Sequence, residues 1–184
     1  MNQQDLMRKF HSSLPAVKEW IEKTLDENKN RAVPVIDLDF PRINKVFPLE
    51  LLCRAKAVVV SGKMPFPPLS RFGLTEFALL EKMPIAGITY KDTFFVSHFH
   101  QTESLYFHEL IHIVQWDRLG VNDFLLAYGA GLIQFGYENS PFEKMAYSLQ
   151  VSFDKDALPD NIVELIQDRT DAIWKGIASL FQKV

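Results

Sequence analysis

The first regular pattern of hydrophobic positions in the chain is helical. Its apolar residues recur at helical spacing: Val17, Trp20, Ile21 and Leu25. Ser13 fits the N-cap, and Pro15 fits the first helical turn, where the N–H that proline lacks has no partner in any case. The sequence therefore predicts a helix that begins near Leu14 and fades in the polar run 26–30.

Alternating and β-branched patterns follow in the first half of the chain. The elements expected here are strands at 32–39 and 56–61, a short helix at 75–82 and a β-hairpin at 85–96. Pro34 indicates an edge position for the first strand, because proline cannot donate to a ladder. The hairpin is expected to turn at Lys91-Asp92. The run 49–54 fits either a helix or a strand.

The pattern becomes helical after Thr102 and stays so. The predicted helices cover about 102–119, 122–135, 141–153 and 160–182. Gly120 and Gly136 are expected to end the first two of them. Strands gather in the first half and helices in the second, and no long linker divides the chain. We therefore expect a single α+β domain over residues 1–184.

Composition narrows the classes of function. A net charge of −3 over 184 residues gives no electrostatic footprint for nucleic acid, and no apolar run is long enough for a membrane span. The first residues do not resemble a secretory signal, so a cytoplasmic location is expected, with export by another route left open. The lone Cys53 excludes a disulfide framework, and its apolar neighbours predict a core position. The oligomeric state is not indicated.

One motif carries chemistry. His108-Glu109-Leu-Ile-His112 places two histidines at i and i+4, one above the other on a helix. Two imidazoles so placed can each give one nitrogen to a single Zn²⁺. Glu109 is rotated by about 100° from His108 around the helix axis, too far to share the metal comfortably. It can instead take a proton from a water on the metal.

The surroundings of the motif support a metal. Apolar residues lie on nearly every side of this helix, which predicts burial: Leu105, Tyr106, Phe107, Leu110, Ile111, Ile113 and Val114. Two buried histidines and a carboxylate without partners would cost several kcal/mol, on the order of what unpaired buried polar groups cost in general. A metal and its water would supply those partners. The competing interpretation is a pair of hydrogen-bonded core histidines beside a glutamate in an ion pair.

A catalytic zinc needs a third protein ligand, and no histidine follows His112. The nearby carboxylates are Asp117, Asp123, Glu138 and Glu143. We expect Asp117 and Asp123 to belong to a solvated turn and a helix cap. Glu143 lies near the start of the next helix, where Ser140-x-x-Glu143 also matches a capping box. Spacing alone favours Glu143 and leaves Glu138 open.

The run 108–116, His-Glu-Leu-Ile-His-Ile-Val-Gln-Trp, followed by Pro141-Phe-Glu143-x-x-Ala146-Tyr147, resembles a gluzincin. It is most similar to short bacterial domains that read His-Glu-Leu-x-His-Val-Val-Gln. The resemblance covers about residues 85–150, the expected metal-binding core. It implies a zincin-like fold, in which a small N-terminal sheet packs on a mainly helical C-terminal half, and it implies that Glu143 is the third zinc ligand. It also implies that the hairpin 85–96 is the edge strand that binds substrate in extended form.

The chain departs from the pattern at one position. Some gluzincins use a second downstream histidine to stabilise the oxyanion, and this chain has none. Tyr128, Tyr137 and Tyr147 are candidates by residue type, although each also fits a core or rim position. Gln115 lies on the same helical face as the two histidines. Its role is expected to be either a hydrogen bond to a metal ligand or packing alone. A second pair of histidines, at 98 and 100, is expected at the surface.

The leading hypothesis is a zinc metallohydrolase, most simply a peptidase acting on a peptide or protein. His108, His112 and Glu143 would bind Zn²⁺, and Glu109 would act as general base and then as acid toward the leaving amine. The alternative is a catalytically silent zincin-fold module in a larger assembly, with a metal that only stabilises the fold. Glu109 favours the enzyme, because a structural site needs no base. The missing oxyanion histidine and the absence of an obvious propeptide favour the module.

Overall fold

The strands of the first half form one mixed sheet in a computed structural model that describes residues 3–178. The strands are β1 (Val33–Pro34), β2 (Lys56–Val60), β3 (Gly87–Tyr90) and β4 (Thr93–Ser97), in the order β1-β2-β4-β3. β2 runs parallel to β4, and the two outer pairs are antiparallel. Pro34 lies on an edge strand, as predicted. The hairpin is also confirmed, and its strand β3 forms the other edge of the sheet.

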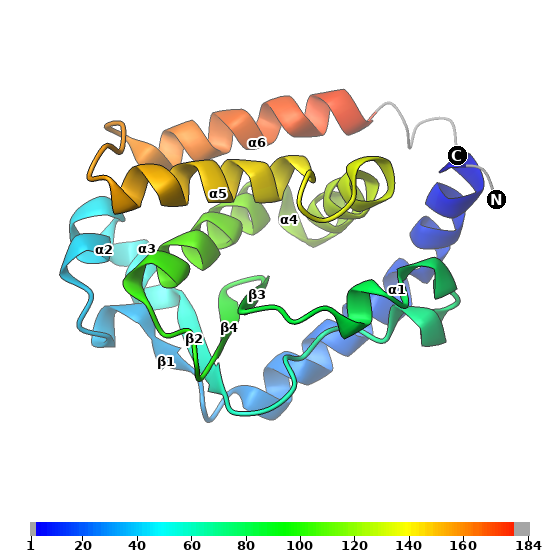
Figure 1. The fold of residues 1–184 in the computed structure, drawn as a ribbon, viewed down its shortest axis with the longest axis horizontal. Helices are drawn as coiled ribbons and strands as arrows, with labels where there is room; N and C mark the ends of the chain where they lie inside the picture. Colours follow the sequence, from blue (N-terminus) through cyan, green and yellow to red (C-terminus); the bar gives the residue numbers. More distant parts are fainter. Residues whose placement is uncertain (1–2, 179–184) are drawn as a thin grey trace.

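Long helices account for most of the remaining chain. They are α1 (Gln3–Asn28), α4 (Glu103–Phe135), α5 (Pro141–Asp154) and α6 (Ile162–Ala178), with α2 (Pro41–Val46) and α3 (Leu49–Arg54) as shorter ones. α4, α5 and α6 lie together on one side of the molecule, and α1 runs along the opposite side (Figure 1). The fold is thus α+β, with a small four-stranded sheet and a mostly helical C-terminal half.

α4 joins the two helices that the sequence predicts at 102–119 and 122–135. Gly120 adopts φ 71° and ψ 174°, a conformation that only glycine adopts without strain, and the helix bends there. Thr102 caps the first arm, since its Oγ1 accepts a hydrogen bond from the backbone N–H of Leu105 at 3.2 Å. Gly136 ends the second arm, as predicted. The last predicted helix is α6, and the final part of that prediction, 179–182, lies outside the described residues.

The predicted start of the first helix is wrong. α1 begins at Gln3, and Pro15 lies inside it. Ser13 is not an N-cap, because its hydroxyl donates to the backbone oxygens of Lys9 and Phe72 at 2.8 and 2.9 Å. A continuous buried stripe passes through the proline: Met7, Phe10, Leu14, Val17 and Ile21. Burial of that stripe outweighs the one helical hydrogen bond that Pro15 removes.

Three smaller elements also differ from the prediction. The strand at 32–39 shortens to β1 and continues as a 3₁₀ turn, η1 (Val35–Asp37), in which the N–H of Val35 donates to the oxygen of Ala55 at 2.8 Å. The ambiguous run 49–54 is the helix α3. The short helix at 75–82 is instead two 3₁₀ turns, η3 (Thr75–Phe77) and η4 (Leu80–Lys82); another, η2 (Leu69–Phe72), precedes them.

Cys53 is exposed, so its predicted core position is wrong. It lies on the outer side of α3, while its neighbours Leu51 and Leu52 are buried. Short helices place adjacent residues on different faces, so apolar neighbours do not fix burial.

Aromatic contacts hold the first arm of α4 between the sheet and α5. Phe94 of β4 meets Tyr106 edge-on with ring centroids 5.3 Å apart, and Phe107 stacks on Phe153 of α5 at 4.3 Å. These contacts fix the rotation of α4 about its axis. No helix within residues 3–178 combines the length and the apolar character that a membrane span requires.

Candidate metal centre

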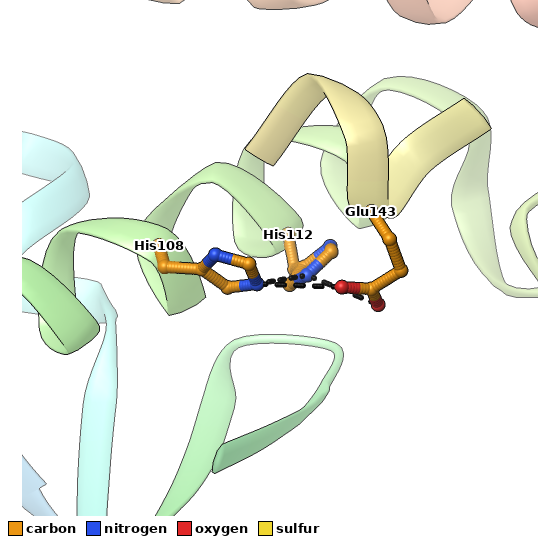
Figure 2. Close-up of side chains that lie close together, drawn as sticks. All are labelled: His108, His112 and Glu143. Carbon is orange, nitrogen blue, oxygen red and sulfur yellow. Dashed lines mark hydrogen bonds and ion pairs between the residues drawn. The ribbon is translucent and has the colours of Figure 1, made fainter. Parts of the chain in front are cut away.

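The two histidines of the motif lie one turn apart on the buried first arm of α4. His108 and His112 are 4% and 5% exposed, and Glu143 of α5, which faces them, is 2% exposed. The three side chains point toward one another from two helices (Figure 2). A buried group of two imidazoles and a carboxylate is therefore present where the motif predicts a metal site.

The distances within this cluster match a metal site. The Nε2 atoms of His108 and His112 are 3.1 Å apart. Glu143 Oε2 lies 3.4 Å from the first of them, and Oε1 lies 3.5 Å from the second. Ligands at about 2.0–2.1 Å from a tetrahedral ion are separated by roughly 3.3–3.4 Å. One ion can therefore contact all three residues with little rearrangement.

Two glutamines fix the tautomers of the histidines. His108 Nδ1 lies 3.0 Å from Oε1 of Gln150, and His112 Nδ1 lies 2.8 Å from Oε1 of Gln115. An amide oxygen only accepts hydrogen bonds, so both Nδ1 atoms carry the proton and donate it. The glutamines are held in turn, because Gln150 donates to Ser104 Oγ at 3.0 Å and Gln115 donates to Met145 Sδ at 3.6 Å. Both Nε2 atoms therefore face the centre of the cluster, where each can bind a metal when it carries no proton.

This arrangement of donor atoms can hold a cation at its centre. Without an ion, the two Nε2 atoms share a hydrogen bond at 3.1 Å and form ion pairs with the carboxylate of Glu143, as in the competing interpretation of the motif. Among the described residues, Glu143 Oε2 is one of three buried side-chain polar atoms without a hydrogen-bond partner. A divalent ion would satisfy both nitrogens and this oxygen together. The donor set therefore fits zinc, which imidazole and carboxylate ligands bind well.

Without a metal, the electrostatics of the cluster favour a proton on His112. Burial acts to lower the pKa of His112, but the Glu143 carboxylate outweighs it and raises that pKa to about 9. Burial acts to raise the pKa of Glu143, but the charge of His112 and the hydrogen bonds from the imidazoles hold it well below its usual range. A proton on His112 thus balances the charge of the Glu143 carboxylate, at the place where a metal would bind.

Tyr128, on the second arm of α4, orients the carboxylate. Its hydroxyl donates to Glu143 Oε1 at 2.6 Å. Burial keeps the pKa of this phenol well above its usual value, so it stays a donor at neutral pH. The oxygen Oε1 is therefore held while Oε2 is left to the cluster.

Glu109 lies beside the cluster and contacts the sheet. It is 3% exposed, and its Oε2 accepts a hydrogen bond from Thr89 Oγ1 of β3 at 2.7 Å. A Cβ at Gly87 would come within 2.2 Å of Glu109 Oε1, so only glycine leaves room for the carboxylate there. Burial raises the pKa of Glu109, while the charges of His108 and His112 oppose the rise. The edge strand thus fixes the position of this group.

A cavity of about 100 Å³ adjoins both the cluster and Glu109. Its walls come from α1, from residues 66–69, from β3 and from both arms of α4. Tyr137, in the turn before α5, also lines it. The cavity gives a small molecule or one side chain room beside the cluster.

The structure separates the carboxylate candidates for the third ligand. Glu138 is exposed in the turn before α5 and does not belong to the cluster. Asp117 forms an ion pair with Arg54, and Asp123 lies in the second arm of α4. Neither joins the cluster, although both lie within α4 instead of in a turn and a cap.

The capping box that competes for Glu143 is not formed. Ser140 is the N-cap of α5 but makes no side-chain hydrogen bond there, and its hydroxyl is buried without a partner. The side chain of Glu143 is turned to the histidines instead.

The other residues singled out by sequence occupy varied positions. Tyr147 packs its ring on that of His108 at 4.7 Å and is half exposed. Gln115 touches His112, as a supporting group would. Trp116 stacks on Phe124 at 4.0 Å, in agreement with packing. The histidines at 98 and 100 are both exposed, as predicted.

Three residues of the site escape the sequence analysis. Gln150 lies seven positions after Glu143, so the helical face of α5 could have indicated it. Gly87 and Thr89 carry no local signal, because their role comes only from the approach of β3 to α4.

Comparisons with protein-family models, with curated proteins and with solved structures find no match to this chain. The case for a metal centre therefore rests on the motif and on the geometry of the cluster.

Proposed function

We propose that this protein is a zincin-like, zinc-dependent hydrolase that cleaves amide bonds in a peptide or protein. The observation that carries the proposal is the buried cluster of His108, His112 and Glu143, in which two Nε2 atoms and a carboxylate converge. Glu109 beside it supplies a base that a purely structural site would not need.

Zinc is the ion that this donor set suits, and His108, His112 and Glu143 would hold it. When bound, it would supply Lewis acidity, which polarises a carbonyl group and lowers the pKa of water. The chain itself supplies the remaining functions, which are orientation, proton transfer and substrate binding.

Glu109 is the group that moves the proton. Its carboxylate would accept a proton from the attacking water and return it to the nitrogen of the leaving amine. Burial raises its pKa toward neutrality, which suits both steps. The hydrogen bond from Thr89 holds Oε2, so the other carboxylate oxygen, Oε1, is the one available for the proton.

β3 is the expected binding element for the substrate backbone. It forms an edge of the sheet, and Gly87, Ile88 and Thr89 line the cavity. An edge strand offers unpaired N–H and C=O groups to an extended chain. A peptide paired with this edge would bring one of its amide bonds near Glu109.

Tyr137 is the best placed of the three tyrosines to stabilise an oxyanion. It lines the cavity, whereas Tyr128 is engaged by Glu143 and Tyr147 packs on the outer side of His108. Burial keeps the pKa of Tyr137 far above neutrality, so its hydroxyl remains a hydrogen-bond donor.

Replacement of Glu109 by Gln tests the proposal. Glutamine keeps the size of the side chain but cannot accept the proton, so hydrolysis of a mixed peptide library is expected to fall by about 10²–10⁴-fold. Zinc content, measured by metal analysis, should stay near one ion per chain. Glu138→Gln is the matched control, since Glu138 is exposed in the turn before α5, and it should leave both quantities unchanged.

A second function, a metal-stabilised binding module, is favoured by one observation. The three cluster residues are at most 5% exposed, and a structural metal site needs no access for substrate. The same experiment separates the two functions. A zinc-loaded parent protein that cleaves no peptide, or cleavage that survives in Glu109→Gln, would contradict the hydrolase.

A further inference from the structure

We propose that Asp154, the last residue of α5, is a positioning residue that determines which ring nitrogen of His108 is free to bind a metal. It is exposed, and it lies at the far end of a chain of hydrogen bonds that leads from the surface to the cluster. The inference rests on the proposed function, because it concerns a ligand of the proposed metal centre.

The chain of hydrogen bonds crosses the contact between α4 and α5. Ser104 Oγ donates to Asp154 Oδ2 at 3.0 Å, and Gln150 Nε2 donates to Ser104 Oγ at 3.0 Å. Gln150 Oε1 lies 3.0 Å from His108 Nδ1. Ser104 and His108 are four positions apart on α4, as Gln150 and Asp154 are on α5, so each pair lies on one helical face. The two faces meet where the helices pack together.

The carboxylate of Asp154 fixes the direction of every hydrogen bond in this chain. An ionised carboxylate only accepts, so the hydroxyl of Ser104 donates its single proton to Asp154. The hydroxyl then accepts from Gln150, whose NH₂ group faces Ser104 and whose oxygen faces His108. Because that oxygen only accepts, Nδ1 of His108 carries the proton, and Nε2 is left to bind the metal.

Without this anchor the chain could run in either direction. A glutamine amide offers an acceptor at one end and donors at the other. If the NH₂ group of Gln150 faced His108, the imidazole would accept at Nδ1 and carry its proton on Nε2. That proton would occupy the nitrogen that has to bind zinc, and it would have to leave before the metal could enter. Asp154 thus stabilises the tautomer that is ready for the metal.

His112 is supported in a different way. Its Nδ1 lies 2.8 Å from Gln115 Oε1, and Gln115 Nε2 donates to Met145 Sδ at 3.6 Å. A thioether sulfur is a weak, uncharged acceptor, and both of these supporting side chains are buried. A change at Asp154 should therefore alter the hydrogen bond of His108 at Nδ1 and leave that of His112 in place.

Asp154 contributes little to the stability of its own helix. α5 ends at this residue, and a negative charge near the C-terminal end of a helix is unfavourable. The side chain is also exposed, so it does not fill the core. Its position is explained by the hydrogen bond from Ser104 and by the chain behind that bond.

Asp154→Asn tests the proposal. An amide has about the size of a carboxylate but can donate as well as accept, so the direction of the chain is no longer fixed. We expect zinc affinity, measured by competition with a chelator, to fall about tenfold, the lower end of the range for residues that hydrogen-bond to a metal ligand directly. The melting temperature of the metal-free protein should stay the same or rise slightly, because a negative charge leaves the end of α5.

Heteronuclear NMR of the histidine ring nitrogens in the metal-free protein gives a second measurement. A protonated ring nitrogen and a bare one resonate at different frequencies, so the spectrum reports the tautomer. In the parent, His108 should carry its proton on Nδ1. In Asp154→Asn, part of the population should carry it on Nε2, while Nδ1 of His112 stays protonated. An effect of Asp154 on stability alone would not change the tautomer.

Variants of Ser104 locate the effect in the chain. Ser104→Ala removes the link and should weaken zinc binding as much as Asp154→Asn does. Combining the two changes should cost no more than either alone, because both interrupt the same chain. Ser104→Thr keeps the hydroxyl and should bind zinc like the parent. Asp168→Asn is the matched control, since it removes the same charge at an exposed position of α6.

The outcomes separate this inference from the proposed function. If the parent binds zinc but Asp154→Asn has the same affinity and the same tautomer of His108, the role of Asp154 is wrong and the metal centre stands. A Ser104→Thr variant that binds zinc as weakly as Ser104→Ala also overturns the chain. If the parent binds no zinc, the proposed function fails, and an unchanged tautomer in Asp154→Asn would overturn this inference separately.

Discussion

Each imidazole of the cluster is fixed through both of its nitrogens. The Nδ1–H groups of His108 and His112 donate to glutamine oxygens, and each Nε2 points to the centre of the cluster. Neutral amides accept these hydrogen bonds, where metal sites often use a carboxylate. The negative charge near the proposed metal would therefore come from Glu143 and Glu109, the carboxylates among the described residues that line the cavity.

Glu143 is expected to be indispensable for metal binding. Glu143→Gln keeps the shape of the side chain but removes its charge, and an amide is a poor ligand for zinc. Removal of a residue that only hydrogen-bonds to a metal ligand typically lowers the metal affinity by about 10–100-fold. Removal of the ligand itself should therefore lower the zinc affinity by at least about a hundredfold. Competition with a zinc chelator measures the change. Glu138→Gln should bind zinc like the parent, and the reverse pattern would assign the third ligand to Glu138.

At the scale of elements, the site depends on how closely β3 approaches α4. Gly87 of β3 leaves the space that Glu109 fills, and Thr89 donates to the same carboxylate. β3 therefore has two roles in the proposed enzyme: it positions the base Glu109, and its unpaired edge binds the substrate backbone.

Gly87→Ala tests this approach. The added Cβ would come within 2.2 Å of Glu109 Oε1, so the carboxylate must move. A displacement of about 1 Å in a catalytic group can cost on the order of 10²-fold in rate, and we expect a loss of that size in kcat. Zinc content should not change, because Glu109 is not a ligand. Gly62→Ala is the control, since a Cβ there meets nothing within 4 Å.

Local patterns predicted the parts of the site that lie on one helix. His108 and His112 needed only the i, i+4 spacing. The residue type of Gly120 predicted a helix end, whereas α4 continues through a bend at this position. Spacing favoured Glu143 as the third ligand but could not establish that role. A metal ligand and a capping-box residue at this position differ only in the direction of the side chain. That direction is decided by the packing of α5 on α4.

Long-range packing explains what the sequence did not predict. Pro15 indicates a helix start by local rules, yet Phe10 of the same helix packs against Gly129, more than a hundred residues away, and the helix continues through the proline. Thr89 likewise carries no signal of its own. Such roles arise from contacts between distant segments, which propensity and periodicity do not describe.

At the scale of the whole molecule, the cluster and its cavity lie where four segments meet. α1, β3, α4 and α5 each contribute side chains to this region. The metal would therefore bind only the complete fold, and its binding energy would stabilise that fold by mass action. Removal of the metal should be visible in the stability of the whole protein.

Chelation is expected to lower the melting temperature. Zinc at a thousandfold excess over its Kd contributes about 4 kcal/mol, which corresponds to roughly 8–16 °C for a chain of this size. Differential scanning calorimetry of the loaded and the chelated protein measures the difference. The double variant His108→Ala/His112→Ala should show no effect of the chelator.

The decrease in melting temperature on chelation should also depend on pH, and the protonation of His112 sets the direction of that dependence. Without metal, the folded protein holds a proton on His112 with a pKa of about 9, above the unfolded value of about 6.5. A raised folded pKa stabilises the protein fully below about pH 6.5, and this contribution is lost as the pH rises through 9. The chelated protein should therefore lose stability between pH 6.5 and 9. The zinc-loaded protein should not lose stability over this pH range, because the ion replaces the proton on His112. The difference in melting temperature is thus expected to widen across this range, and a difference that narrows would mean that His112 is not protonated in the metal-free cluster.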